Sequence, residues 1–228
     1  MRLRLGQLRR LIRESLEVSS LAAFRPHSGP GSARIVVYDV DLILRAGAAW
    51  EMEGPAAFGR LLRGGARGYI WIRDPNQMSE KHGPCRGAWE VVTSYFPGGG
   101  DLLYKLAFAI APNGLLVSDR KEVSPRAGER WRKISKTHSG LPLDDKTHPP
   151  GHENHTEDPG DDCVCWAEDG MEHLNVAYAA DGTEATLLKT LEDRHAAVMR
   201  DAALAELAPD MEELLFQAVS QKFADLML

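Results

Sequence analysis

The chain has 228 residues, of which 43% are hydrophobic and 26% charged, and its formal net charge is −6. This length allows one domain with additional elements, and the acidic balance excludes a surface that as a whole binds nucleic acid. No apolar run is long enough to span a membrane, and three cysteines, an odd and low count, argue against a disulfide framework and predict a cytoplasmic protein.

The first segment, residues 1–24, predicts an amphipathic N-terminal helix. Apolar residues recur at helical spacing over residues 2–17, and arginines lie between them. Such a helix either packs on the body of the protein with a solvated basic face or docks on an acidic partner or a membrane surface. Residues 25–34 are rich in Pro, Gly and Ser and predict a linker.

The middle of the chain alternates between short strands and helices. β-branched and aromatic runs predict strands, and apolar residues at helical spacing predict helices. Ser124 followed by Pro125 is typical of a helix start, and Trp131 is expected to face inward. The expected strands are 35–40, 68–73, 87–96, 115–118 and 174–178, and the expected helices are 55–63, ended by Gly64-Gly65, 102–111 and 124–135. The strand 115–118 is interpreted as a buried neighbour of 87–96, with a parallel pairing as one option.

The last third of the chain begins with a polar segment. Residues 136–170 are almost free of periodicity, so they predict an insertion that either has a function or is disordered. Two helices over 184–207 and 210–226, separated at Ala208-Pro209, predict a C-terminal helical hairpin within residues 183–228.

A glycine run carries most of the chemical information. Gly98-Gly99-Gly100-Asp101 stands between the expected strand 87–96 and the expected helix 102–111. Glycines let the backbone approach a ligand closely, and the N–H groups and dipole at a helix start attract anions. The expected occupant is a phosphate or diphosphate. The alternative is a tight turn that only closes a packed strand–helix unit.

This order of elements resembles the GNAT acyltransferase fold. The resemblance implies an α/β (α+β) class, with a mixed central sheet and flanking helices, over residues 34–182. In that family, backbone N–H groups of an Arg/Gln-x-x-Gly-x-Gly/Ala loop bind the pyrophosphate of acetyl-CoA, and Tyr95 occupies the Arg/Gln place here. The implied acetyl-CoA site is formed by Tyr95, Gly98, Gly99, Gly100, Asp101 and Leu102.

A closer resemblance is to GNAT-like proteins found in bacteriophages and some bacteria, and it covers residues 68–180. The segments that carry it are Gly87-Ala88-Trp89-Glu90-Val91, the run from Gly98 to Tyr104, the run from Ser118 to Ser124, and Leu143-Asp144-Asp145. Because one fold hosts many functions, this resemblance bears more on the fold than on activity.

Acetyl transfer to an amine needs a bound thioester, a polarised carbonyl and a deprotonated amine. Glu90, on the strand before the glycine loop, is the expected general base; the alternative is a surface carboxylate at a sheet edge. Asp119 and Arg120 follow the strand 115–118 and are expected to bind substrate or orient the base. Their alternative is an Asp–Arg pair that tethers the loop to the helix at 124. Helix 124–135 offers Trp131 and no tyrosine, the general acid often found there in GNAT enzymes.

The segment 138–165 also suggests a zinc site. His152-x-x-His155 followed by Cys163-x-Cys165 supplies four ligands of the kinds that zinc takes in tetrahedral geometry. A bound metal would order a loop this polar. The alternative is a mobile acidic loop with incidental histidines, and Cys85 is interpreted as a buried thiol.

Two function classes stay open on the sequence. The first is an acyl-CoA-dependent N-acyltransferase, for which the acidic stretch 141–195 favours a cationic acceptor, such as a small amine or a lysine-rich protein. The second is a non-catalytic, phage-related binding or assembly protein on the same fold. Tyr95, the missing tyrosine acid and the terminal helices, which suit a homodimer or a protein partner, favour this second class.

Overall fold

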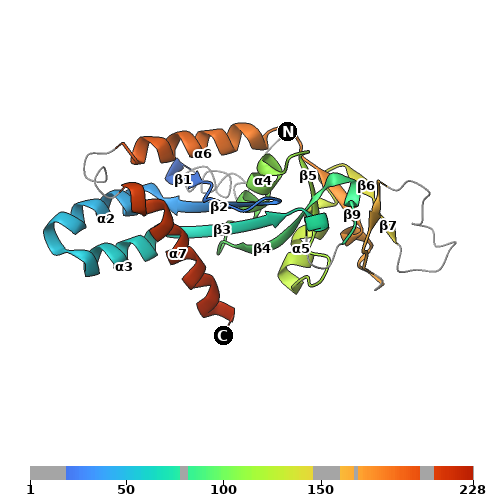
Figure 1. Ribbon diagram of the computed structural model, residues 1–228, viewed down its shortest axis with the longest axis horizontal. Coiled ribbons are helices and arrows are strands. Elements are labelled where there is room, and N and C mark those ends of the chain that lie inside the picture. Colours follow the sequence, from blue (N-terminus) through green and yellow to red (C-terminus); the bar gives the residue numbers. More distant parts are fainter. Residues whose placement is uncertain (1–18, 78–81, 146–159, 167–168, 201–207, 228) are drawn as a thin grey trace, which may run out of the picture. The chain divides into compact units, whose positions relative to one another are not determined.

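The fold is mixed α/β, as the sequence predicted, and is seen in a computed structural model that describes residues 19–77, 82–145, 160–166, 169–200 and 208–227. A seven-stranded mixed sheet has the strand order β1-β2-β3-β4-β5-β9-β6 (Figure 1). In that order the strands are β1 (Leu21–Phe24), β2 (Ser32–Asp39), β3 (Ala66–Arg73), β4 (Trp89–Tyr95), β5 (Leu115–Ser118), β9 (Val176–Ala179) and β6 (Gly140–Pro142). The helices are α2 (Val40–Glu53), α3 (Pro55–Gly65), α4 (Gly100–Ile110), α5 (Pro125–Ile134), α6 (Glu184–Val198) and α7 (Ala208–Met227).

The chain forms two compact units, each built from separate stretches of sequence. The first draws on Met1–Pro26, Val36–Arg67 and Lys189–Leu228, and the second on His27–Ile35 and Gly68–Leu188. Both β2 and β3 therefore contribute residues to each unit. No helix in the described ranges is both long and apolar enough to cross a membrane.

The first unit corrects the prediction for its N-terminal part. Residues 2–17 lie outside the described residues, but Leu21–Phe24 form strand β1 and not part of a helical segment 1–24. All four residues of β1 are buried, and they pair antiparallel with Val36–Asp39 of β2. A four-residue run is too short to show a period, so its burial against β2 decides its structure.

Helix α2 was not predicted, although its start is marked in the sequence. Asp39 caps it, with the side chain accepting from the Leu42 N–H at 3.2 Å, and Ile43, Ala46 and Ala49 are buried at helical spacing. Helix α3 begins at Pro55 as predicted, but it continues through Gly64 and Gly65 instead of ending before them. A Cβ on Gly65 would lie 2.7 Å from Cδ1 of Ile43, so this glycine allows close packing of α3 on α2.

The second unit contains the strands around the glycine run. β3 and β4 pair antiparallel, with a register shift between Trp71 and Ile72, and β4 and β5 pair parallel. Helix α4 leads from the end of β4 to the start of β5 (Figure 1). Ser124 caps α5 by accepting from the Ala127 N–H, and Trp131 is buried, both as predicted.

The polar segment 136–170 contains three short strands in its described part. β6 pairs antiparallel with β9, and β7 (Asp144–Asp145) pairs parallel with β8 (Asp162–Cys163) in a separate two-stranded sheet. Strands of two or three residues give no readable periodicity, so the sequence predicted no regular structure here.

The two C-terminal helices were predicted from their apolar spacing. α6 ends at Val198 and does not continue to 207, and α7 runs from Ala208 to Met227, so Ala208 and Pro209 begin this helix and do not precede it. Residues 201–207 lie outside the described residues. Within the first unit, His195 of α6 joins Glu212 of α7 through its Nε2 at 2.8 Å. Nδ1 of the same ring lies 3.0 Å from the Tyr38 hydroxyl, within hydrogen-bond distance, and the ring stacks on Phe24.

Candidate functional site

The glycine run forms the turn between β4 and α4 that the sequence predicted. Gly98 has a φ of +80°, which side-chain-bearing residues rarely adopt, and Gly99 is the N-cap of α4. The Gly99 N–H donates to the Phe96 carbonyl at 3.1 Å, and the Gly99 carbonyl accepts from the N–H groups of Leu102 and Leu103. The first turn of α4 therefore presents its leading N–H groups at this turn, beside the positive end of the helix dipole.

Two side chains approach the glycines closely. A Cβ on Gly99 would lie 2.5 Å from Cδ1 of the Phe96 ring, and one on Gly100 would lie 2.8 Å from Nη2 of Arg130. The absence of side chains at Gly99 and Gly100 thus makes room for an aromatic ring and a guanidinium. The turn therefore has a packing role, and the ligand role that the sequence suggested stays a prediction.

Arg130 brings a positive charge to the turn from helix α5. It forms an ion pair with Asp101, in the first turn of α4. Its side chain is 21% exposed, and burial lowers the pKa of Arg130, which still leaves the guanidinium charged at neutral pH. The family pattern places a charged or polar side chain at position 95, where Tyr95 stands, and the local sequence does not indicate Arg130 because it comes from the next helix.

Glu90 is a buried anchor. It is fully buried on β4, opposite Val117 of β5. Its Oε1 accepts from Nε of Arg73. Its Oε2 accepts from Nδ1 of His82 at 3.3 Å and from the Arg120 backbone N–H at 3.2 Å. Both oxygens are thus engaged, and Glu90 is not the surface carboxylate of the alternative interpretation.

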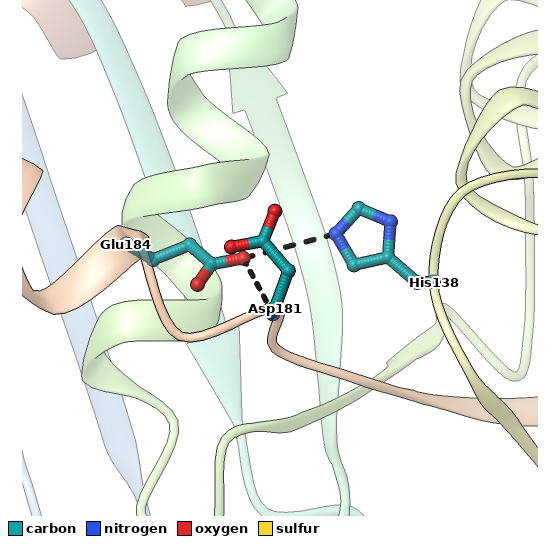
Figure 2. A group of neighbouring side chains, drawn as sticks. All are labelled: His138, Asp181 and Glu184. Atoms are coloured by element: carbon teal, nitrogen blue, oxygen red, sulfur yellow. Dashed lines mark hydrogen bonds and ion pairs between the residues drawn. The ribbon is translucent and has the colours of Figure 1, made fainter.

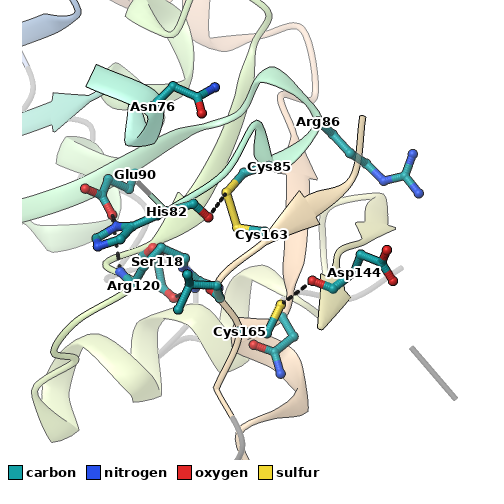
Figure 3. Close-up of a disulfide and its surroundings, with 12 residues drawn as sticks. Asn76, His82, Cys85, Arg86, Glu90, Ser118, Arg120, Asp144, Cys163 and Cys165 are labelled. Carbon is teal, nitrogen blue, oxygen red and sulfur yellow. Dashed lines mark hydrogen bonds and ion pairs between the residues drawn. A yellow bond between two sulfur atoms is a disulfide. The ribbon is translucent and has the colours of Figure 1, made fainter. Parts of the chain in front are cut away.

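His82 is the residue of this network that sequence reasoning missed as a site residue. Its ring and Glu90 point toward each other (Figure 3). A carboxylate only accepts hydrogen bonds, so Nδ1 of His82 carries the proton of this bond and Nε2 holds the free electron pair of the neutral ring. This orientation is the one that a histidine needs to accept a proton at Nε2.

Asp119 and Arg120 bind backbone groups. Oδ1 of Asp119 accepts from the N–H groups of Lys121 and Glu122 at 2.7 and 3.0 Å, which closes the turn after β5. The side-chain bonds of Asp119 and Arg120 thus differ from the alternative interpretation, an Asp–Arg pair that tethers the loop to the helix at 124.

The buried Arg120 guanidinium donates to the carbonyls of Ser118 at 2.9 Å and Leu174 at 2.7 Å. Burial lowers the pKa of Arg120 to about 10, against the opposing effect of nearby negative charge, so the group is charged at neutral pH. Arg120 thereby cross-links the end of β5 to the segment before β9.

A disulfide joins Cys85 to Cys163, which corrects three predictions (Figure 3). Cys85 is buried as expected, but it is bonded to Cys163 and is not a free thiol. The low cysteine count had argued against disulfides, but the fold brings together two residues separated by 78 positions. A disulfide sulfur is not a thiolate, so Cys163 is not available for the predicted zinc site. The thiol of the buried Cys165 donates to the Asp144 carbonyl at 3.2 Å, and His152 and His155 lie outside the described residues.

Comparisons with protein-family models, with curated proteins and with solved structures find no match to this chain.

Proposed function

We propose that this protein is an acyl-CoA-dependent N-acyltransferase that transfers an acetyl group to an amine. The observation that carries the proposal is the arrangement of the parallel pair β4–β5. Only Trp89–Val91 of β4 pair with β5, and their partners are Leu116–Ser118. β5 ends there, whereas β4 continues to Tyr95 and leads into the glycine turn. The last residues of β4 thus extend past β5 toward a helix N-terminus, which suits a long ligand with amides and a diphosphate.

The donor set at the turn fits a diphosphate. The first turn of α4 supplies N–H groups and a positive dipole end, and Arg130 supplies a charge that can form bidentate hydrogen bonds with phosphate oxygens. Asp101 now pairs with this guanidinium and is 75% exposed, so its carboxylate can turn into solvent when a phosphate takes its place. Acetyl-CoA would supply the activated acyl group as a thioester.

The network around Glu90 supplies a proton acceptor near the point where β5 ends. Glu90 contacts the N–H of Arg120, two residues beyond β5, and fixes the orientation of His82. We assign to His82 Nε2 the proton that the amine loses as it forms the new C–N bond, and to Glu90 the positioning of His82. The C–S bond of the thioester would break in the same transfer, and coenzyme A would leave as a thiolate, to which the protonated His82 could return the proton. In this assignment Glu90 acts through His82 and does not itself serve as the base.

The acceptor that fits the charge distribution is cationic. The stretch 141–195 carries far more Asp and Glu than Lys and Arg. A protonated amine or a lysine-rich protein would be attracted to this excess of negative charge, and the attraction would fall as salt is raised.

Calorimetric titration with acetyl-CoA tests the proposal. The wild type is expected to bind, and Gly99→Glu is expected to lose binding because it adds a negative charge at the turn. Gly64→Glu is the matched control, since a Cβ at Gly64 meets nothing within 4 Å. A folded wild-type protein that does not bind acetyl-CoA would contradict the proposal.

A second candidate, a non-catalytic binding protein, is favoured by the way the site is filled. The Phe96 ring lies against Gly99, Arg130 is already paired with Asp101, and His82 is 5% exposed. This candidate predicts a stable complex or homodimer without acetyl-CoA binding. Sedimentation of the purified protein, with and without acetyl-CoA, distinguishes it from the first.

A further inference from the structure

A second group of side chains lies away from the glycine turn, where the loop after α5 meets the start of α6. His138 follows α5, and Asp181 and Glu184 flank the first turn of α6 (Figure 2). One potential ligand atom from each of the three lies within 4.8 Å of the other two. The structure thus brings one imidazole and two carboxylates to a single point.

The His138 ring is held with Nε2 toward the carboxylates. The ring stacks on Phe108 of α4 with centroids 4.8 Å apart. Its Nδ1 lies 2.8 Å from the Thr137 hydroxyl, which in turn lies 3.3 Å from the helix carbonyls of Lys133 and Ile134. A carbonyl can only accept a hydrogen bond, so the Thr137 hydroxyl donates to the carbonyl and accepts a hydrogen bond from the Nδ1–H of His138. The electron pair of the neutral ring is therefore on Nε2.

That Nε2 has no hydrogen-bond partner among the described residues, and it is buried. It lies 3.8 Å from Oε1 of Glu184, too far for a hydrogen bond. An electron pair that faces a carboxylate is repelled unless a positive charge lies between the two groups. The geometry therefore requires either a proton on Nε2 or a cation bound by both groups.

The carboxylates are also held in place. Glu184 is buried, and its two oxygens accept from the N–H groups of Asp181 at 3.0 Å and Gly182 at 2.8 Å. Oδ1 of Asp181 accepts from the N–H and the hydroxyl of Thr183 at 2.8 and 2.6 Å. Together these bonds cap α6. A carboxylate oxygen has two lone pairs, so each Glu184 oxygen, which accepts one bond, can still bind an ion. Oδ1 of Asp181 already accepts two bonds, which leaves Oδ2 as the Asp181 oxygen for an ion.

We propose that His138, Asp181 and Glu184 form a binding site for a divalent transition-metal ion, with Zn²⁺ as the best-fitting case. The ligands are Nε2 of His138 and one oxygen from each carboxylate, a set that zinc accepts and that hard cations such as Mg²⁺, which prefer oxygen alone, do not. Three protein ligands leave a position for water. The Thr137 contact holds the imidazole in the tautomer that binds metal.

This site is independent of the proposed acyltransferase site. Phe108, which supports His138, lies eight residues along α4 from Gly100, or roughly 12 Å along the helix axis. The proposal also differs from the zinc site predicted from His152, His155, Cys163 and Cys165, because it shares no ligand with that set. Loss of metal binding would therefore leave acetyl-CoA binding intact, and loss of acetyl-CoA binding would leave metal binding intact.

Titration of the metal-free, tag-free protein with Co²⁺ tests the proposal, since its visible absorbance reports the ligand set. The wild type is expected to bind one Co²⁺ per chain, which Zn²⁺ displaces, and Zn²⁺ is expected to raise the Tm. His138→Phe keeps an aromatic ring on Phe108 and should abolish the signal. Asp181→Asn keeps the Oδ1 acceptor of Asp181, whereas Glu184→Gln keeps one of the two acceptor oxygens of Glu184. Both variants should weaken binding at least tenfold.

The matched control is His27→Phe, which makes the same substitution at an exposed histidine and should bind Co²⁺ like the wild type. A wild type without stoichiometric metal would overturn the proposal in favour of a protonated His138 paired with Glu184. Equal binding by His138→Phe and the wild type would also overturn it, because the metal would then lie elsewhere in the chain.

Discussion

The Nδ1 atom of His82 lies 3.3 Å from Oε2 of Glu90, a carboxylate that is fully buried and also accepts from Arg73. Glu90 therefore neutralises a guanidinium and orients an imidazole at once. Removing its charge leaves the Arg73 guanidinium without its counter-charge, and the single oxygen of an amide cannot take the place of both carboxylate oxygens.

Glu90→Gln is accordingly expected to destabilise the protein by about 3 kcal/mol, because one partner of a buried ion pair is lost. Urea unfolding measures the change. Glu122→Gln, at an exposed position, is the matched control and should stay within about 0.5 kcal/mol of the wild type. Equal stability of the two variants would show that Glu90 is not the anchor described here.

His82→Gln separates catalysis from binding. If His82 accepts the amine proton, this variant should lower kcat by about a hundredfold or more while acetyl-CoA affinity stays unchanged. Steady-state release of CoA thiol in the presence of an amine gives kcat, and calorimetry gives the affinity. A variant with wild-type kcat and an unchanged pH profile would remove His82 from the mechanism.

Gly64 and Gly65 of α3 are expected to respond oppositely to alanine. Gly64→Ala should stabilise the protein by up to about 1 kcal/mol, because a Cβ meets nothing there and alanine is the better helix former. Gly65→Ala should destabilise it by about 1 to 3 kcal/mol, because its Cβ would lie 2.7 Å from Ile43. Urea unfolding of both variants measures the difference, and equal effects would contradict the packing of α3 on α2.

The burial of Tyr104 is expected to make the folded protein less stable at high pH. Burial raises the pKa of Tyr104 from 10.0 to about 12, against a hydrogen bond with Ser94 that lowers it. Because the pKa is higher in the folded chain, the contribution of the neutral phenol is complete below pH 10 and is lost as pH rises through 12.

Tyr104→Phe should therefore lose less stability than the wild type between pH 8 and pH 12, as measured by urea unfolding at each pH. Absorbance of ionised tyrosine gives an independent check. Ionisation of all five tyrosines near pH 10 in the folded protein would contradict the burial of Tyr104.

The Cys85–Cys163 bond predicts a thiol count. Protein purified without reductant and then denatured should show one reactive thiol, that of Cys165, and three after reduction. Reduction should lower the unfolding free energy by about 4 kcal/mol, because the bond closes a long loop. Cys165→Ala is the control, which should lower the count to zero and keep the bond. Three thiols before reduction would show that the bond does not form.

The sequence predicted the elements whose pattern is long or sharply marked. Strands β3 and β4, helices α4 and α5, and the glycine turn all follow from local periodicity and cap residues such as Ser124. Strand β1 was misassigned because Leu21–Phe24 are too few residues to show a period, and their burial against β2 fixes the outcome. The α2 helix was missed although Asp39 marks its start.

The candidate site was only partly predictable, because its partners come from distant parts of the chain. Gly98, Gly99 and Glu90 were identified from local sequence, but Arg130 reaches the turn from the next helix. The contact of His82 with Glu90 depends on the path of the chain after β3. The disulfide likewise joins residues 78 positions apart, and no spacing rule for three cysteines indicates that pairing.

Binding of the acetyl-CoA diphosphate by the α4 turn with Arg130 is tested most directly by a pair of arginine variants on one helix. Arg130→Gln removes the charge at the turn, whereas Arg132→Gln removes an exposed charge that pairs with Glu129. Calorimetry should show binding by the wild type and Arg132→Gln, and about tenfold or weaker binding by Arg130→Gln, the loss expected for a charge-assisted hydrogen bond. Equal affinity in all three proteins, or no binding by a folded wild type, would contradict the account.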